Sequence, residues 1–301
     1  MVASSLRPVN EFVSVDAPPA SDWSAPRPVG LAPQLWALAR PTDATIASLG
    51  LPDGALVHGG DSQLLGWVST PGSDADLGEV WLRCARSFPA TGLWPICDTV
   101  ALRPGRAWDH VEVDGRPIWR DPYAVPSDVY DAANTADRQD YFNGPDGELD
   151  HRELLAEFGL AEADRRLAEA SVMPADLLRR LVAPVPPRRL TLVACRRPSD
   201  AVLLLDFGVA NDDATPGIFV GVLRSWETRF GVVPVMLDLA WTGFQVLDPP
   251  ADGTQIDRLA AEVFSFATDT GVQGGFHRWY GDPVGDARSM VQSSQWLIWW
   301  D

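Results

Sequence analysis

The sequence predicts an α/β or α+β fold, in which helices flank a mixed sheet and which also carries a helical acidic insert and a Pro-rich N-terminal lead-in. Three observations lead to this prediction. Short apolar runs alternate with segments of helical spacing in both halves of the chain. Residues 121–170 contain 13 acidic residues and only four arginines. Residues 1–34 hold six prolines with little periodicity, which is typical of an extended lead-in.

Residues 35–120 are predicted to form an N-terminal α/β region. Two short apolar runs within 55–70 flank Gly59-Gly60-Asp61, a sequence typical of a tight turn, and therefore predict two strands. Helical spacing of apolar residues follows over 76–88, and a further strand is expected at 93–100.

The segment 121–183 is predicted to be mainly helical and acidic. Asp150 and Glu153 have the spacing of a capping box, Gly159 suits a helix end, and Pro174 suits the first turn of another helix. We expect two or three helices between 150 and 183. Prolines at 184, 186 and 187 cannot continue a helix, so residues 184–188 are predicted to be a linker.

Residues 189–301 are predicted to form a C-terminal α/β domain. Its expected strands lie at 189–195, 201–209, 232–237 and 243–247, and its expected helices at 217–230 and 255–268. The stretch 222–238 is weakly similar to 80–98, because each has a Leu-Arg pair in a helix, then a glycine, then a strand that contains proline and ends at aspartate. Common sheet-building sequence explains this similarity about as well as a duplication does.

The charge of the chain limits its partners and its chemistry. The formal net charge is −17, and all 24 basic residues are arginines. Without lysine, Schiff-base catalysis, Walker A nucleotide binding and protein-kinase chemistry are excluded. An acidic chain repels nucleic acid, so we expect no nucleic-acid partner and favour a basic protein as the partner.

Local motifs for cofactors and membranes are missing from the sequence. The four histidines are tens of residues apart, and we found neither a GxSxG nor a GxGxxG motif in the expected context, so we predict no metal and no cofactor. No apolar run approaches the roughly 18 residues of a membrane span. Three cysteines without CxxC spacing, Cys84, Cys97 and Cys195, are expected to be reduced and buried. We therefore expect a cytoplasmic protein with no membrane contact.

Several short motifs in a fixed order carry a resemblance to a known family. These are LRSWETRFG at 223–231, Pro249-Pro250, LAAEVFSFATD at 259–269 and WLIWWD at 296–301. Together they resemble the bacterial family catalogued as domain of unknown function 4253, over about residues 185–301. The resemblance implies no catalytic residues, because the family has no established reaction. The signature residues are Trp226, Pro249, Pro250, Glu262, Asp269, Trp296, Trp299, Trp300 and Asp301.

Three functions remain open at the level of sequence. The first is a non-catalytic acidic protein-binding module of immunity or regulatory type, and the second is an enzyme with a dispersed active site. The third is a purely structural domain. The best candidates for binding residues are Arg224, Glu227, Asp238, His277 and Trp279, for which ion pairing or core packing is the simpler interpretation.

The terminal tryptophans predict how the fold closes. Chain ends are ordered only when they are tied down, so we expect Trp296, Trp299 and Trp300 to dock onto the sheet and Asp301 to lie at the surface. The sequence leaves the oligomeric state open.

Overall fold

A computed structural model gives the structure of the chain. It describes residues 23, 27, 30–58, 63–70, 75–97, 111–113, 116–118, 176–185, 187–205, 207, 216–238, 241–267, 270 and 283–300. The predicted acidic helices lie outside these residues, apart from the short 3₁₀ helix η2 (Leu177–Arg180), and so does most of the Pro-rich lead-in.

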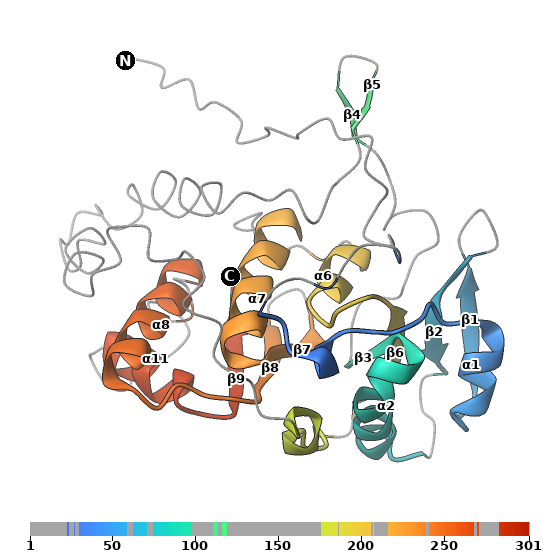
Figure 1. Cartoon of the computed structure of the whole chain (residues 1–301), viewed down its shortest axis with the longest axis horizontal. Coiled ribbons are helices and arrows are strands. Elements are labelled where there is room, and N and C mark those ends of the chain that lie inside the picture. Colours follow the sequence, from blue (N-terminus) through green and yellow to red (C-terminus); the bar gives the residue numbers. More distant parts are fainter. Residues whose placement is uncertain are drawn as a thin grey trace.

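A mixed sheet of seven strands forms the centre of the described fold (Figure 1). Its order is β1-β2-β6-β3-β7-β8-β9, and every neighbouring pair is antiparallel except β3 and β7, which are parallel. The strands are β1 (Gly54–His58), β2 (Leu64–Ser69), β3 (Leu93–Cys97), β6 (Leu190–Ala194), β7 (Val232–Leu237), β8 (Trp241–Val246) and β9 (Gln295–Trp299). The predicted mixed α/β-type fold is therefore confirmed.

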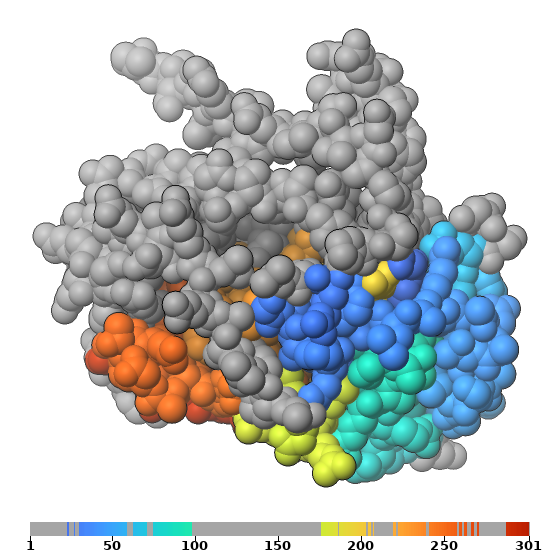
Figure 2. Space-filling model, in the orientation of Figure 1, coloured from blue at the N-terminus to red at the C-terminus, as the bar shows by residue number. Residues whose placement is uncertain are grey.

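The N-terminal part contributes three strands and the helix that packs on them. Helix α2 (Leu77–Thr91) begins at Asp76, whose carboxylate accepts hydrogen bonds from the N–H groups of Gly78 and Glu79. Its buried side packs on β3, where Trp94 meets the rings of Trp81 and Phe88 edge-on. Two short helices, η1 (Pro33–Leu35) and α1 (Asp43–Ser48), precede β1. In Figure 2 the surfaces of η1 and η2 both lie against α2.

Strand β6 joins the two predicted regions into one sheet. It follows the Pro-rich residues 184–188, yet it pairs with β2 on one side and with β3 on the other. Residues on both sides of the predicted linker therefore share the same ladder of hydrogen bonds. The predicted boundary lies within the described fold, and not between two separate sheets.

Helix α7 (Pro216–Phe230) and helix α2 end in the same way. Gly92 and Gly231 both adopt left-handed backbone conformations, with φ of 66° and 62°. Each glycine N–H bonds the carbonyl oxygen four residues earlier, Phe88 or Glu227, and the chain then enters β3 or β7. These two strands are the parallel neighbours of the sheet, so the strands of the two weakly similar sequences lie side by side.

One predicted strand is wrong. Residues 201–209 were expected to be a buried strand, but the chain forms helix α6 (Asp200–Leu204). A short apolar run has no periodicity that separates a strand from a buried helical turn. Pro198, Ser199 and Asp200 precede the run, and such residues favour the start of a helix over the continuation of a strand.

Two helices and the last strand complete the C-terminal part. Helix α8 (Gly253–Phe266) is capped by Asp252 and lies beside α11 (Pro283–Val291) (Figure 1). The chain then forms β9, whose Trp296 packs on Trp226, while the following Trp300 packs on Phe266. Trp296 and Trp300 are buried, so the predicted docking is confirmed for these two tryptophans. Trp299 is half-buried and packs on Trp241 on the other side of the strand, and Asp301 lies outside the described residues.

The remaining described elements are small. Strands β4 (Val111–Val113) and β5 (Arg116–Ile118) form a two-stranded ladder of their own. All three cysteines are buried and free of disulfides, as predicted. Among the described helices, none has the length and apolar character needed to cross a membrane.

Candidate functional site

Two of the five predicted binding residues come together in the structure. Arg224 and Glu227 both lie on α7 and belong to one buried polar cluster. Asp238 follows β7 and is exposed at the other end of that strand from Gly231, so it does not join the cluster. His277 and Trp279 lie outside the described residues.

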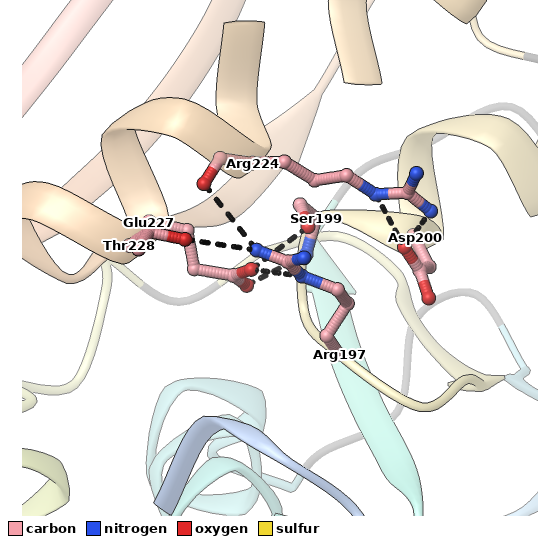
Figure 3. Close-up of polar contacts among 6 residues, drawn as sticks. All are labelled: Arg197, Ser199, Asp200, Arg224, Glu227 and Thr228. Carbon is pink, nitrogen blue, oxygen red and sulfur yellow. Dashed lines mark hydrogen bonds and ion pairs between the residues drawn. The ribbon is translucent and has the colours of Figure 1, made fainter. Parts of the chain in front are cut away.

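The cluster forms where the chain leaves β6 and enters α6 (Figure 3). This junction supplies three of the side chains in the cluster. Helix α7 supplies the other three, which are three or four residues apart or adjacent and so lie on one side of the helix. We call this set the junction cluster; it consists of Arg197, Ser199, Asp200, Arg224, Glu227 and Thr228.

Glu227 is the centre of the junction cluster. Its carboxylate accepts hydrogen bonds from Arg197 Nε at 2.5 Å, from the Ser199 N–H at 3.0 Å and from the Ser199 hydroxyl at 2.9 Å. The Glu227 side chain is 0% exposed and that of Arg197 is 4% exposed. A buried charge of this kind is tolerated because charge-assisted hydrogen bonds replace its lost hydration.

Arg224 binds the carboxylate of Asp200 and not that of Glu227, its neighbour on α7. Its Nε and Nη2 atoms donate to Asp200 Oδ1 at 3.1 and 2.6 Å. The two ion pairs of the cluster are therefore Arg224–Asp200 and Arg197–Glu227. The backbone carbonyl of Arg224 still takes part, since it accepts a hydrogen bond from Arg197 Nη2 at 3.3 Å.

Burial dominates the electrostatics of the junction cluster. It raises the pKa of Glu227 above the ordinary 4.5, while the Arg197 guanidinium pulls that pKa down and Asp200 pushes it up. Burial also raises the pKa of the Cys195 thiol well above 9.0, and the negative charges of Asp200 and Glu227 act in the same direction. Cys195 is thus held as a thiol, the poorly nucleophilic form of cysteine.

The contacts of the junction cluster hold α7 against the segment that joins β6 to α6. Two guanidinium groups face two carboxylates, so the four charges compensate each other within the fold. The three hydrogen bonds on Glu227 tie α7 to the residues that follow β6. Among the described residues, no three His, Cys, Asp or Glu side chains form a group that could hold a metal ion.

A third buried carboxylate, outside the junction cluster, joins α7 to α8. Glu262 accepts a hydrogen bond from the Trp226 indole N–H at 3.0 Å, and Arg229 binds both of its oxygens. Trp226 and Glu262 were predicted only as signature residues, and the structure brings them into direct contact. Pro249 and Pro250 lie between β8 and α8, and Asp269 lies outside the described residues.

Sequence reasoning missed most of the junction cluster. Of its six residues, only Arg224 and Glu227 were predicted as binding residues, whereas Arg197, Ser199, Asp200 and Thr228 were not. The available signal was the order Arg-Arg-Pro-Ser-Asp directly after a buried strand, which places helix-starting residues beside arginines. Which carboxylate each arginine would bind depends on the placement of α7, and a linear sequence does not contain that information.

Residues 189–301 match the model of a family described as a domain of unknown function, DUF4253. The chain therefore carries a DUF4253 domain in its C-terminal region, and the resemblance seen in the motifs is confirmed. Neither the curated proteins nor the solved structures gave a match to the chain. The matched region begins one residue before β6, so strands outside it, β2 and β3, complete the pairing of its first strand.

Proposed function

We propose that the protein is a non-catalytic, acidic protein-binding module of immunity or regulatory type that acts in the cytoplasm on a basic protein partner. One observation carries the proposal, which is the uneven distribution of charge along the chain. The described residues contain 15 arginines and 14 aspartates or glutamates, a formal charge of +1. The rest of the chain contains 9 arginines and 27 aspartates or glutamates, a formal charge of −18.

This distribution favours a binding role because the described strands and helices carry almost no net charge, while the rest of the sequence carries the negative excess. The largest block, residues 121–170, has a charge of −9 and lies in the sequence between β3 and β6. Concentrated negative charge destabilises a compact chain by self-repulsion, so its presence calls for a function that benefits from it. Attraction of a positively charged protein is such a function, since it accelerates encounter and excludes acidic competitors.

The junction cluster supports the non-catalytic part of the proposal. Arg224 and Glu227 were the strongest candidates for an enzyme, and Glu227 has the raised pKa that catalytic carboxylates often show. Both carboxylates of the cluster, however, are fully buried and bound by arginine. A structural ion-pair network explains these contacts without a substrate.

The test is affinity capture from a bacterial lysate at low and at high salt. The wild-type chain is compared with a variant in which the 13 acidic residues of 121–170 are changed to Asn or Gln. We expect the wild type to retain a stoichiometric basic protein at low salt and to release it at high salt, and the neutralised variant to retain none. Equal capture by both chains, or no stoichiometric basic partner at low salt, contradicts the proposal.

A further inference from the structure

One face of the last strands of the sheet is not covered by any helix of the described residues. Side chains alternate between the two faces of a strand, so Phe244 and Trp296 point toward α7 and their neighbours point away. On the side that points away, Trp241 is 39% exposed and Leu297 is 49% exposed. We call this side the outer face of β7–β9; its residues are Met236, Asp238, Trp241, Gly243, Gln245, Gln295, Leu297 and Trp299.

Two indole rings form the centre of the outer face. Trp241 and Trp299 are paired directly across β8 and β9, and their ring centroids are 6.1 Å apart at an interplanar angle of 44°. Leu297 lies opposite Gly243, which has no side chain to cover it. Exposed tryptophans with apolar neighbours are typical of the energetic centres of protein interfaces.

A carboxylate stands beside these rings. Asp238 and Trp241 close the β7–β8 hairpin with two backbone hydrogen bonds, from the Asp238 N–H at 2.9 Å and from the Trp241 N–H at 3.2 Å. Residues that exchange both bonds are direct cross-strand partners, so their side chains share a face. The exposed Asp238 is therefore next to the exposed ring of Trp241.

We infer that the outer face of β7–β9 is the surface that contacts the basic partner, through an arginine or lysine that lies over Trp241 beside Asp238 and an apolar residue that covers Leu297. This inference rests on the proposed function. The negative faces of indole rings attract cations, and a neighbouring carboxylate adds to that attraction.

Exposed apolar side chains support the second part of the proposal, in which an apolar residue of the partner covers Leu297. Val182 is 46% exposed and is held beside the same face, because the Gln245 side chain exchanges two hydrogen bonds with the Val182 backbone, at 3.0 and 2.8 Å. Trp241, Leu297 and Val182 thus extend the apolar surface from the hairpin along β8. A segment that alternates basic and apolar residues matches this pattern of one carboxylate, two rings and aliphatic side chains.

The experiment uses the full chain and a defined probe, an octapeptide of alternating arginine and leucine. Its control is the same peptide with citrulline, a neutral analogue, in place of arginine. Calorimetry measures both peptides against the wild type, Trp241→Ala and Asp238→Asn. Leu38→Ser and Asp53→Asn are the matched controls, since Leu38 is 78% exposed and Asp53 is exposed on other elements.

We expect the arginine peptide to bind the wild type and the citrulline peptide to bind at least about tenfold more weakly. Trp241→Ala is expected to weaken binding about tenfold or more, and Asp238→Asn by roughly threefold, while the two control variants bind like the wild type. Selective labelling of tryptophan in the wild type gives an independent readout, in which the Trp241 and Trp299 indole signals shift on addition of peptide.

The outcomes separate this inference from the proposed function. Binding that needs arginine but is unchanged in Trp241→Ala and Asp238→Asn overturns the inference, while the proposed acidic binding role stands. If Trp241→Ala captures a basic protein from lysate as well as the wild type does, the inference is likewise overturned and the proposed function stands. Absence of peptide binding to the wild type, or peptide binding without any shift of the Trp241 signal, also overturns the inference.

Discussion

Trp94 donates its indole N–H to the carbonyl oxygen of Pro234 at 2.8 Å, and this buried hydrogen bond joins β3 to β7. Trp94 precedes the DUF4253 match and Pro234 lies inside it. The bond therefore connects the matched domain to a strand that the family match does not contain. The sheet depends on both parts of the chain.

A fragment of residues 189–301 is expected not to unfold cooperatively. Within it β6 has lost both of its neighbours, and β7 has lost β3 and the Trp94 hydrogen bond. Buried strand edges without partners leave their N–H and C=O groups unsatisfied. Circular dichroism during heating tests this, with the full chain as the control. A sharp melting transition of the fragment contradicts the prediction and indicates an independent domain.

Arg224→Ala is expected to lower the free energy of unfolding by about 3 kcal/mol, because it leaves the buried Asp200 carboxylate without its guanidinium. The matched control is Arg288→Ala, since Arg288 also pairs with an aspartate but is 46% exposed. That change is expected to cost less than about 1 kcal/mol. Urea unfolding of both variants measures the difference, and equal losses refute the assignment of a structural role to the junction cluster.

Glu227→Gln is expected to reveal a pH dependence. The raised pKa of Glu227 means that the folded protein binds this proton more tightly than the unfolded chain does. The stability that this group contributes is complete below about pH 4.5 and is lost as the pH rises through the raised value. The wild type should therefore lose stability relative to Glu227→Gln as the pH rises above about 4.5. Urea unfolding of both proteins at a series of pH values from 4.5 upward measures the difference in their free energies of unfolding. A difference that grows in favour of the wild type as the pH rises contradicts the prediction.

Gly231→Ala is expected to destabilise the fold by about 1–2 kcal/mol, because the helix exit requires φ of +62°. Gly253→Ala is the control, since Gly253 opens α8 without a positive φ and has no atom within 4 Å of an added Cβ. This change should stabilise by about 0.5 kcal/mol through the unfolded state. Thermal unfolding checks both variants: the melting temperature should fall in Gly231→Ala and rise in Gly253→Ala. A melting temperature of Gly231→Ala at or above that of the wild type contradicts the prediction.

Removal of residues 296–301 is expected to abolish cooperative unfolding. It deletes most of β9 and exposes the rings of Trp226 and Phe266, on which Trp296 and Trp300 pack. Leu297→Ser serves as the control within the same strand, because Leu297 is half-exposed and its loss should leave the melting temperature nearly unchanged. A shortened chain that melts like the wild type would instead identify this segment as a partner-binding tail.

The sequence was informative where local rules decide the structure. Helical spacing located α2 and α7, and the apolar runs located β1, β2, β3, β6, β7 and β8 with small shifts at their ends. Asp252 at the start of α8 and the glycines after α2 and α7 are local signals of helix ends. Strand β9 and helix α11 were not predicted as elements, although the docking of the terminal tryptophans was.

How these elements pair and pack could not be predicted from local sequence rules. Nothing local in Leu190–Ala194 specifies that this strand pairs with β2 and β3 on its two sides. The partners of Arg197 and Arg224 likewise follow from the position of α7. The outer face of β7–β9 combines residues from a hairpin and from the end of the chain, and only their pairing places Trp241 beside Trp299.

The late position of β6 in the chain has a consequence for synthesis. Strands β2 and β3 leave the ribosome long before Leu190, and until β6 arrives each has an unpaired edge facing the gap between them. Such edges are templates for aggregation, and contacts between distant segments form slowly. The interval between the synthesis of β3 and that of β6 is therefore when the nascent chain is most vulnerable to misassembly, and shielding by a chaperone has its greatest effect there.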